Sequence, residues 1–124
     1  IPGDAVMHAR PVGRGYVRLQ QSADFPWPAA PGEPAGAVRL GHEFHHSSLE
    51  NLDPGVRWAY RVQRGHGVDG THDGLCVHNV LASYAHQRHT GGNRWPERFL
   101  AFVAAVRAQA AHTAVHAVER RCAA

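Results

Sequence analysis

Chain breakers divide most of this sequence into short segments. All 13 glycines and all but one of the 8 prolines lie before residue 94. Between these breakers, apolar and polar residues alternate as they do in half-buried strands. We therefore expect short strands at residues 15–20, 37–40 (continuing toward residue 44), 58–62, 75–77 and 80–84. We expect residues 1–15 to be loop-like, and residues 48–53 to form a turn or one helical turn.

The spacing of apolar residues changes in the last third of the chain. From Trp95 to Val106 they recur at intervals of three and four, which is one face of a helix. The pattern predicts a helix over about residues 94–120, with this apolar stripe packed in the core. Several strands followed by one packing helix indicate an α/β or α+β unit.

Composition narrows the classes of function. A chain of 124 residues, 44% hydrophobic and 19% charged, is typical of one globular domain or part of one. Its first residue is Ile1, which indicates processing or a fragment. The absence of a membrane-length apolar run and of a signal peptide predicts a cytoplasmic protein that does not bind membranes. The basic residues are all arginine and are scattered, so nucleic-acid binding gains no support. Without lysine, no P-loop can form.

Eleven histidines raise the question of a metal site. Residues 42–46 (HEFHH) satisfy the HExxH string of zinc proteases, which requires a helix that puts both histidines on one face. Here the string follows the strand-like residues 37–40 and Gly41, and no third ligand is marked. We interpret it as a chance occurrence and expect no metal. A His-rich metal-binding protein stays open as an alternative that metal analysis would test.

A second candidate for chemistry is His86. The strand-like residues 80–84 deliver it just before a loop. Strand ends hold a side chain rigidly and leave it accessible, which suits catalysis. A histidine exposed at a strand end without a function is the alternative, and spacing alone favours that alternative.

Two motifs together resemble one family. Residues 41–47 (GHEFHHS) are similar to the GHEFHYS signature of cobyrinic acid a,c-diamide synthases, with His46 in place of Tyr. Residues 83–86 (SYAH) resemble the SYLH segment that carries the catalytic histidine of the family's glutaminase site. The resemblance extends over most of residues 1–103. Weaker similarities lie at residues 2–5, 15–17 and 69–74.

The resemblance implies a fold and a site. The fold is α/β, as the C-terminal part of a class I glutamine amidotransferase-like (flavodoxin-like) domain, strand-rich over residues 15–84. His86 is implied as the general base that activates a cysteine thiolate. The candidate substrate-binding residues are His42, His45 and Tyr84. For His42 and His45, which would line the glutaminase pocket or the ammonia route, a structural hydrogen-bond role stays open as an equal alternative.

Two departures from the family pattern affect the implied chemistry. Class I glutaminases usually have Glu two residues after the histidine, where this chain has Arg88. Glu43 is therefore our candidate for orienting the His86 ring, a second catalytic residue. Neither Cys76 nor Cys122 lies in a strand-turn-helix elbow, so we expect the nucleophile outside this chain, which alone should be inactive.

The resemblance also implies partners. Glutamine is the nitrogen donor, and a tetrapyrrole carboxylate is the acceptor. ATP and Mg²⁺ are expected in an amidoligase domain outside this chain. The main alternative is a non-catalytic remnant or separate subunit with a binding role. An unpaired sheet edge would favour a homo-oligomer.

Overall fold

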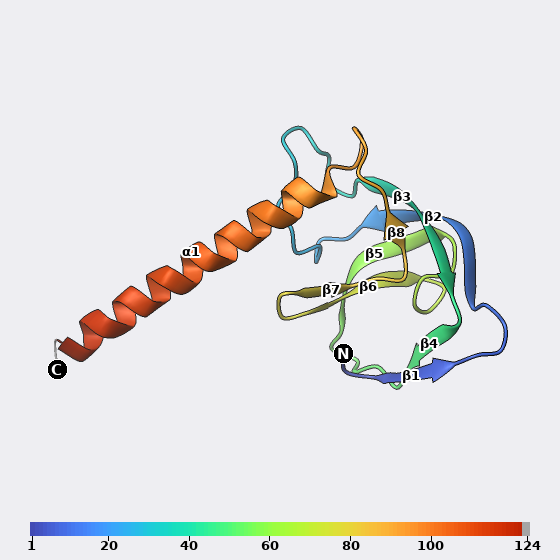
Figure 1. Ribbon diagram of the computed structural model, residues 1–124, viewed down its shortest axis with the longest axis horizontal. Helices are drawn as coiled ribbons and strands as arrows, with labels where there is room; N and C mark the ends of the chain where they lie inside the picture. Colours follow the sequence, from blue (N-terminus) through green and yellow to red (C-terminus); the bar gives the residue numbers. More distant parts are fainter. Residues whose placement is uncertain (123–124) are drawn as a thin grey trace.

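The protein consists of a set of strands followed by one helix (Figure 1). The structure, a computed structural model, describes the backbone of residues 1–122 and the side chains of residues 1–113. The elements in chain order are β1 (Asp4–Met7), β2 (Gly13–Gln21), β3 (Val38–His45), β4 (Ser47–Glu50), β5 (Arg57–Arg64), β6 (His72–Val77), β7 (Val80–Ala82), β8 (His86–Gln87) and α1 (Trp95–Cys122).

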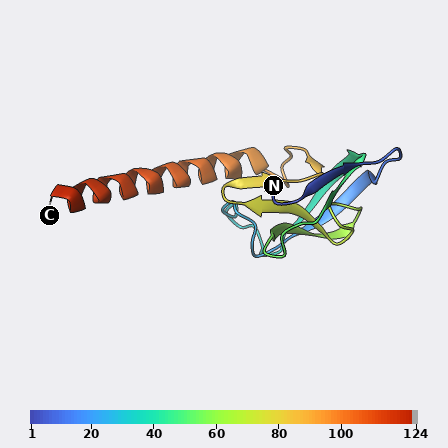
Figure 2. The ribbon, with the colours of Figure 1, turned by 90° about the horizontal axis from the view of Figure 1, so that it is seen from below.

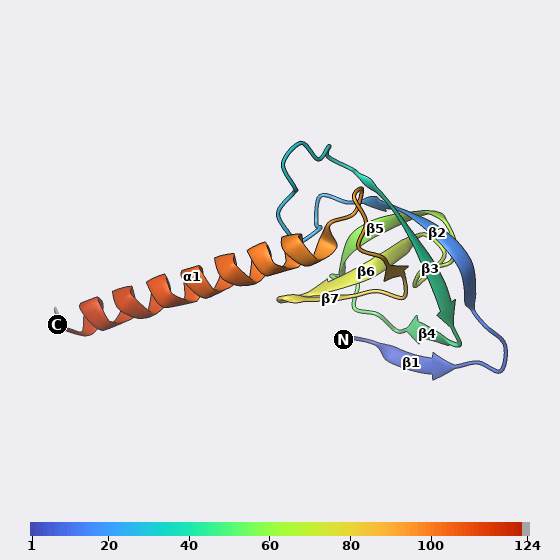
Figure 3. The same cartoon turned by 45° about the horizontal axis from the view of Figure 1, so that its top comes forward.

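Six strands form one antiparallel sheet in the order β7-β6-β5-β2-β3-β8. Its edge strands β7 and β8 are separated in the chain by residues 83–85 alone. Those residues span at most about 14 Å, whereas five strand spacings in a flat sheet amount to about 24 Å. The sheet must therefore curl so that its two edges approach each other, as Figure 3 shows.

The core fills the inside of this curl. Along β2, buried and more exposed residues alternate, and Val17 and Leu19 face inward with 2% and 0% of their surface exposed. Ala59 and Tyr60 on β5 complete the cluster with Cys76 on β6.

Close packing inside the curl requires a glycine on β6. Gly74 has a φ of 72°, and a Cβ there would lie 2.9 Å from side-chain atoms of both Ala59 and Tyr60. Only glycine adopts this backbone conformation readily and leaves room for both neighbours.

A buried carboxylate fixes the link between the two sheet edges. Asp73 on β6 has no exposed surface. Its oxygens accept hydrogen bonds from Ser83 Oγ at 2.7 Å and from the backbone nitrogens of Tyr84 and Ala85 at 3.1 and 3.3 Å. All three linking residues therefore donate to one side chain, which determines how the chain passes from β7 to β8.

A second, two-stranded sheet corrects two predictions. Residues 4–7 were expected in a loop and form β1, and residues 47–50 form β4 where a turn or helical turn was expected. The two strands pair antiparallel from Asp4 with Glu50 to Met7 with Ser47. Each is four residues long, too short for its alternation to be distinguished from a loop without its partner.

The position of the helix is as predicted, but its packing is not. Only the first turns of α1 contact the strand region, and Figures 1 and 2 show the helix projecting away from it. Within the predicted stripe, Phe99 is 41% exposed, and Trp95, Phe102, Val103 and Val106 are only half-buried. The expectation that the apolar stripe lies in the core is therefore wrong, because no other described element covers it. No described helix is long and apolar enough to span a membrane.

Ion pairs and aromatic contacts anchor the start of the helix. Arg98 is 6% exposed, pairs with Glu33 at 3.2 Å and donates to the carbonyl oxygen of Pro28 at 2.7 Å. Arg39 on β3 also pairs with Glu33. Burial, followed by the nearby charge of Arg98, lowers the pKa of Arg39. Trp27 packs on Phe99 with ring centroids 5.5 Å apart.

The α/β class is confirmed in its coarse form. Strands precede a single helix, and the five predicted strand regions correspond to β2, β3, β5, β6 and β7. All strand pairs of the described residues are antiparallel, so no part of the parallel sheet of a flavodoxin-like domain is present among them.

We predict that Asp73→Asn destabilises the protein by about 2–4 kcal/mol, because the amide replaces a charged acceptor of three buried hydrogen bonds. The free energy of unfolding from urea denaturation checks this. Asp24→Asn is the control, since the Asp24 side chain is exposed, and it should change stability by less than about 0.5 kcal/mol. Equal effects of the two substitutions would contradict the role given to Asp73.

Tyr60 makes stability depend on alkaline pH. Its burial raises the pKa of the phenol from 10.0 to about 12, against the opposing effect of the hydrogen bond from Gln87. The folded state keeps the phenolic proton that the unfolded state loses, so this stabilisation is complete below pH 10 and is lost as pH rises through 12. The free energy of unfolding should fall by about 1.4 kcal/mol per pH unit in this window. Tyr60→Phe should remove that slope in denaturation curves; an unchanged slope would count against it.

Candidate functional site

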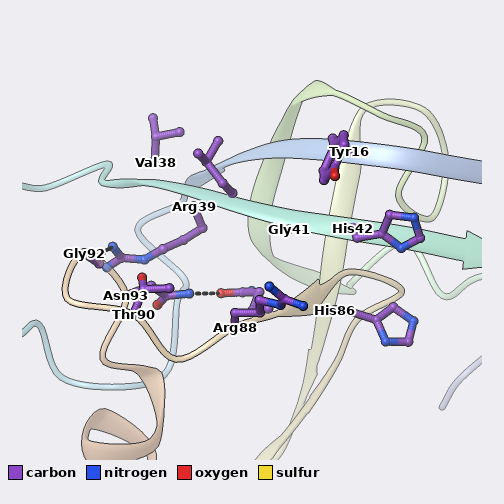
Figure 4. A pocket seen from close by; sticks show the side chains of 12 residues that line it. Tyr16, Val38, Arg39, Gly41, His42, His86, Arg88, Thr90, Gly92 and Asn93 are labelled. Carbon is purple, nitrogen blue, oxygen red and sulfur yellow. Dashed lines mark hydrogen bonds between the residues drawn. The ribbon is translucent and has the colours of Figure 1, made fainter.

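Backbone pairing brings two of the predicted site histidines together. His86 begins β8 and lies directly opposite His42 of β3 in the antiparallel register. Residues paired in this way project from the same face of a sheet. Both side chains are exposed, and Figure 4 shows the two rings projecting from neighbouring strands.

The row of exposed side chains continues onto β2. Tyr16 is paired with His42 in the register, and it is 76% exposed. The rings of Tyr16 and His42 meet edge to face with centroids 6.0 Å apart. The row therefore crosses three strands in the order Tyr16, His42, His86. Tyr16 was not predicted as a site residue, although the alternation along residues 15–20 places it on the outer face.

The residue after His86 holds β8 to the core. Gln87 donates from Nε2 to Tyr60 Oη at 2.9 Å and accepts from Asn93 Nδ2 at 3.0 Å. Successive side chains of a strand point to opposite faces. The inward anchor of Gln87 therefore directs the His86 ring outward.

A hollow of about 730 Å³ lies along this part of the outer face. His42 and His86 line it, together with Arg88, which directly follows β8. The remaining lining residues are Tyr16, Val38, Arg39, Leu40, Gly41, Gln87, Thr90, Gly92 and Asn93. Two predicted site residues, one catalytic and one substrate-binding, thus share one accessible concave surface.

Glu43 lies on the opposite face. It is 1% exposed, and its oxygens accept from the backbone nitrogens of His66 and Gly67 at 2.7 and 2.9 Å. His86 projects from the same face as His42, whereas Glu43, the next residue along β3, points to the other face. Among the described residues, no hydrogen bond joins Glu43 to His86. The geometry therefore does not support Glu43 as the group that orients His86. Instead, Glu43 holds the turn after β5.

The other two predicted substrate-binding residues, His45 and Tyr84, lie away from the hollow; His45 is buried and Tyr84 is half-buried. His45 and Tyr84 stack with ring centroids 3.7 Å apart and planes 10° from parallel. His45 Nδ1 lies 2.8 Å from the Ser47 carbonyl oxygen, and Tyr84 Oη lies 2.7 Å from Ser47 Oγ. Neither residue lines the hollow. His45 Nε2 lies 3.8 Å from Glu43 Oε2, so His45 packs beside the buried Glu43, and Tyr84 packs on His45.

The HExxH string cannot act as it does in zinc proteases. Residues 42–45 belong to β3, not to a helix. Four residues of extended chain separate His42 from His46 by about 13 Å, too far for one metal ion to bind both.

Cys76 lacks the properties of a nucleophile. It is 5% exposed, and its Sγ lies 3.7 Å from the carbonyl oxygen of Asp24. Burial raises the pKa of the thiol, with a weaker opposing effect of Arg57, whereas a nucleophilic thiol needs a lowered pKa. The Cys122 side chain lies outside the described residues.

Sequence comparison identifies relatives of one kind. The chain is 43% identical over 95 residues to the cobyrinate a,c-diamide synthase of Magnetococcus marinus, a match that covers 77% of this chain and 19% of that protein. It is 36% identical to the synthase of Halobacterium salinarum and 35% identical to that of Haloarcula marismortui, each over 69% of this chain and 18% of the relative.

The chain therefore spans about one fifth of the length of these relatives. No protein-family model matches it, and no solved structure shows a significant match. The relatives agree with one another in name, and the best of these alignments covers most of the strand region. On this evidence, the chain belongs to the cobyrinate a,c-diamide synthase family.

Proposed function

We propose that this chain is the histidine-bearing, C-terminal part of a class I-like glutamine amidotransferase domain. In this proposal the domain hydrolyses glutamine in the cytoplasm and supplies ammonia for ATP-dependent amidation of cobyrinate-type carboxylates in cobalamin biosynthesis. Membership of the synthase family supports the pathway. The single observation that carries the glutaminase assignment is the exposed His86 ring on the wall of the hollow.

His86 acts in this proposal as a general base. Its accessible imidazole takes the proton of a cysteine thiol supplied from outside residues 1–124, and the thiolate attacks the side-chain amide carbon of glutamine. The imidazolium returns the proton to the departing nitrogen, which leaves as ammonia. Water then cleaves the glutamyl thioester and releases glutamate.

The other predicted site residues divide into two roles. His42 shares the hollow with His86 and is proposed to contact the substrate. Glu43, His45 and Tyr84 are proposed to support β3 and residues 83–85 from the buried side. They act on the site as positioning residues.

The residues of this chain do not fit an ATP–Mg²⁺ site. The sequence contains no lysine for a phosphate-binding loop. Within the described residues, no three metal-binding side chains come together. In the proposal, activation of the acceptor carboxylate therefore takes place in an amidoligase domain outside residues 1–124, and no step of that reaction is assigned here.

A hybrid enzyme tests the proposal. The 95-residue matched stretch of the Magnetococcus marinus synthase is replaced by the corresponding residues of this chain, and glutamate release from glutamine is measured. His86→Ala should lower that rate by about 10²- to 10⁴-fold, because general base catalysis is lost. Amidation with ammonium chloride as the nitrogen source should persist, which separates loss of chemistry from loss of folding.

His89→Ala is the matched control. His89 is an exposed histidine that pairs with Glu97 at 3.2 Å and does not line the hollow, so glutamate release should continue. Unchanged release by His86→Ala would contradict the assignment of the base. A hybrid that amidates with ammonium chloride but releases no glutamate even without substitution would favour the non-catalytic binding role.

A further inference from the structure

The hollow beside β3 and β8 is cationic. Its twelve lining residues include two arginines, and none is aspartate or glutamate. A concave surface lined by charge of one sign concentrates its electric field and attracts ligands of the opposite sign. The lining therefore favours an anionic ligand.

Arg88 is the lining cation that has no acidic partner. It follows β8, lines the hollow with His86, and is exposed. Within the described residues, no ion pair or hydrogen bond engages its guanidinium. The other lining arginine, Arg39, is already bound to Glu33 and donates to the carbonyl oxygen of Gly92 at 3.0 Å.

The wall behind the hollow adds positive charge. Arg39 and Arg98 both pair with the single carboxylate of Glu33. Gln21, which accepts from both guanidinium groups, is neutral. Two cations against one anion leave one net positive charge in a buried cluster, where screening by salt is weak.

We propose that the hollow is a carboxylate-binding site and that Arg88 holds the carboxylate. Guanidinium offers two parallel N–H donors that match the two oxygens of a carboxylate, and the pairing is strong because both groups are charged. The ligand is assigned as the α-carboxylate of glutamine, and this identity rests on the proposed function. Bound there, the amino acid lies beside His42 and His86. The volume of about 730 Å³ also admits a larger carboxylate, such as an acid side chain of the tetrapyrrole acceptor.

Binding to the 124-residue chain tests the site without catalysis. NMR signals of His42, His86 and the Arg88 guanidinium are followed during addition of L-glutamine, its α-amide, or the polycarboxylate uroporphyrin. L-glutamine should shift these signals, and the α-amide should bind about tenfold or more weakly, because it lacks the carboxylate. Shifts with uroporphyrin but not L-glutamine, lost in Arg88→Gln, would support the carboxylate site and assign it to the acceptor.

Matched arginine variants test the role of Arg88. Arg88→Gln should weaken binding by about 10- to 100-fold, and Arg88→Lys should restore part of it by keeping the charge. Arg14→Gln removes the same charge from an exposed position on β2 outside the hollow, and it should have little effect. Equal losses in Arg14→Gln and Arg88→Gln, or no binding of any carboxylate, would overturn the proposal. Backbone amide spectra verify that each variant is folded.

The hybrid enzyme distinguishes failure of this inference from failure of the proposed function. Arg88→Gln should raise the KM for glutamine by about tenfold or more and change kcat little, since the contact is made equally in substrate and transition state. Glutamine hydrolysis with an unchanged KM in Arg88→Gln would overturn the inference and leave the function intact. If the hybrid binds L-glutamine in an Arg88-dependent way but releases no glutamate, the inference stands and the proposed function is contradicted.

Discussion

The arrangement of the whole molecule depends on the carboxylate of Asp73. Its three hydrogen bonds tie all the residues of the short link that carries the chain from one edge of the sheet to the other. That link ends immediately before His86, so the interactions that close the curl also position this histidine. A buried carboxylate that accepts from backbone N–H groups holds the donating segment rigidly, because each N–H group left unpaired would carry a desolvation penalty.

Glu43 acts in the same way elsewhere in the core, where its buried carboxylate accepts hydrogen bonds from backbone N–H groups. Both acids are buried, and both are satisfied by backbone donors of a turn rather than by a cation. The result is a division between the two faces of the sheet. The inner face anchors turns through Asp73 and Glu43 and strand β8 through Gln87, and the outer face presents His42 and His86 to the hollow.

The spacing of apolar and polar residues predicted the elements that are long enough to show a regular pattern of their own. Strands β2, β3 and β5 are long enough for alternation to identify them, and the spacing of apolar residues located α1. Strands β1, β4 and β8 have two to four residues each and exist through pairing with distant segments. The packing of α1 was predicted wrongly, because an apolar stripe indicates a face suited to burial without specifying what covers it.

The candidate site was predictable in part for a similar reason. Resemblance singled out His86 and His42, and the register brings them together. Our hypothesis for Glu43 and the assignment of His45 placed these residues in the same site, although neighbours along a strand point to opposite faces. The supporting residues Asp73 and Gln87 carried no sequence signal, because their partners are backbone groups and side chains that only the folded sheet assembles.

Because α1 projects from the strands, we expect local unfolding to begin in this helix. Its 28 residues extend for about 42 Å, but only the first turns are tied to the strands, through Arg98 and the contact between Trp27 and Phe99. The turns from Leu100 to Thr113 can therefore fray while the sheet stays folded, and their amide hydrogens should exchange with solvent far sooner than those of β2 and β5.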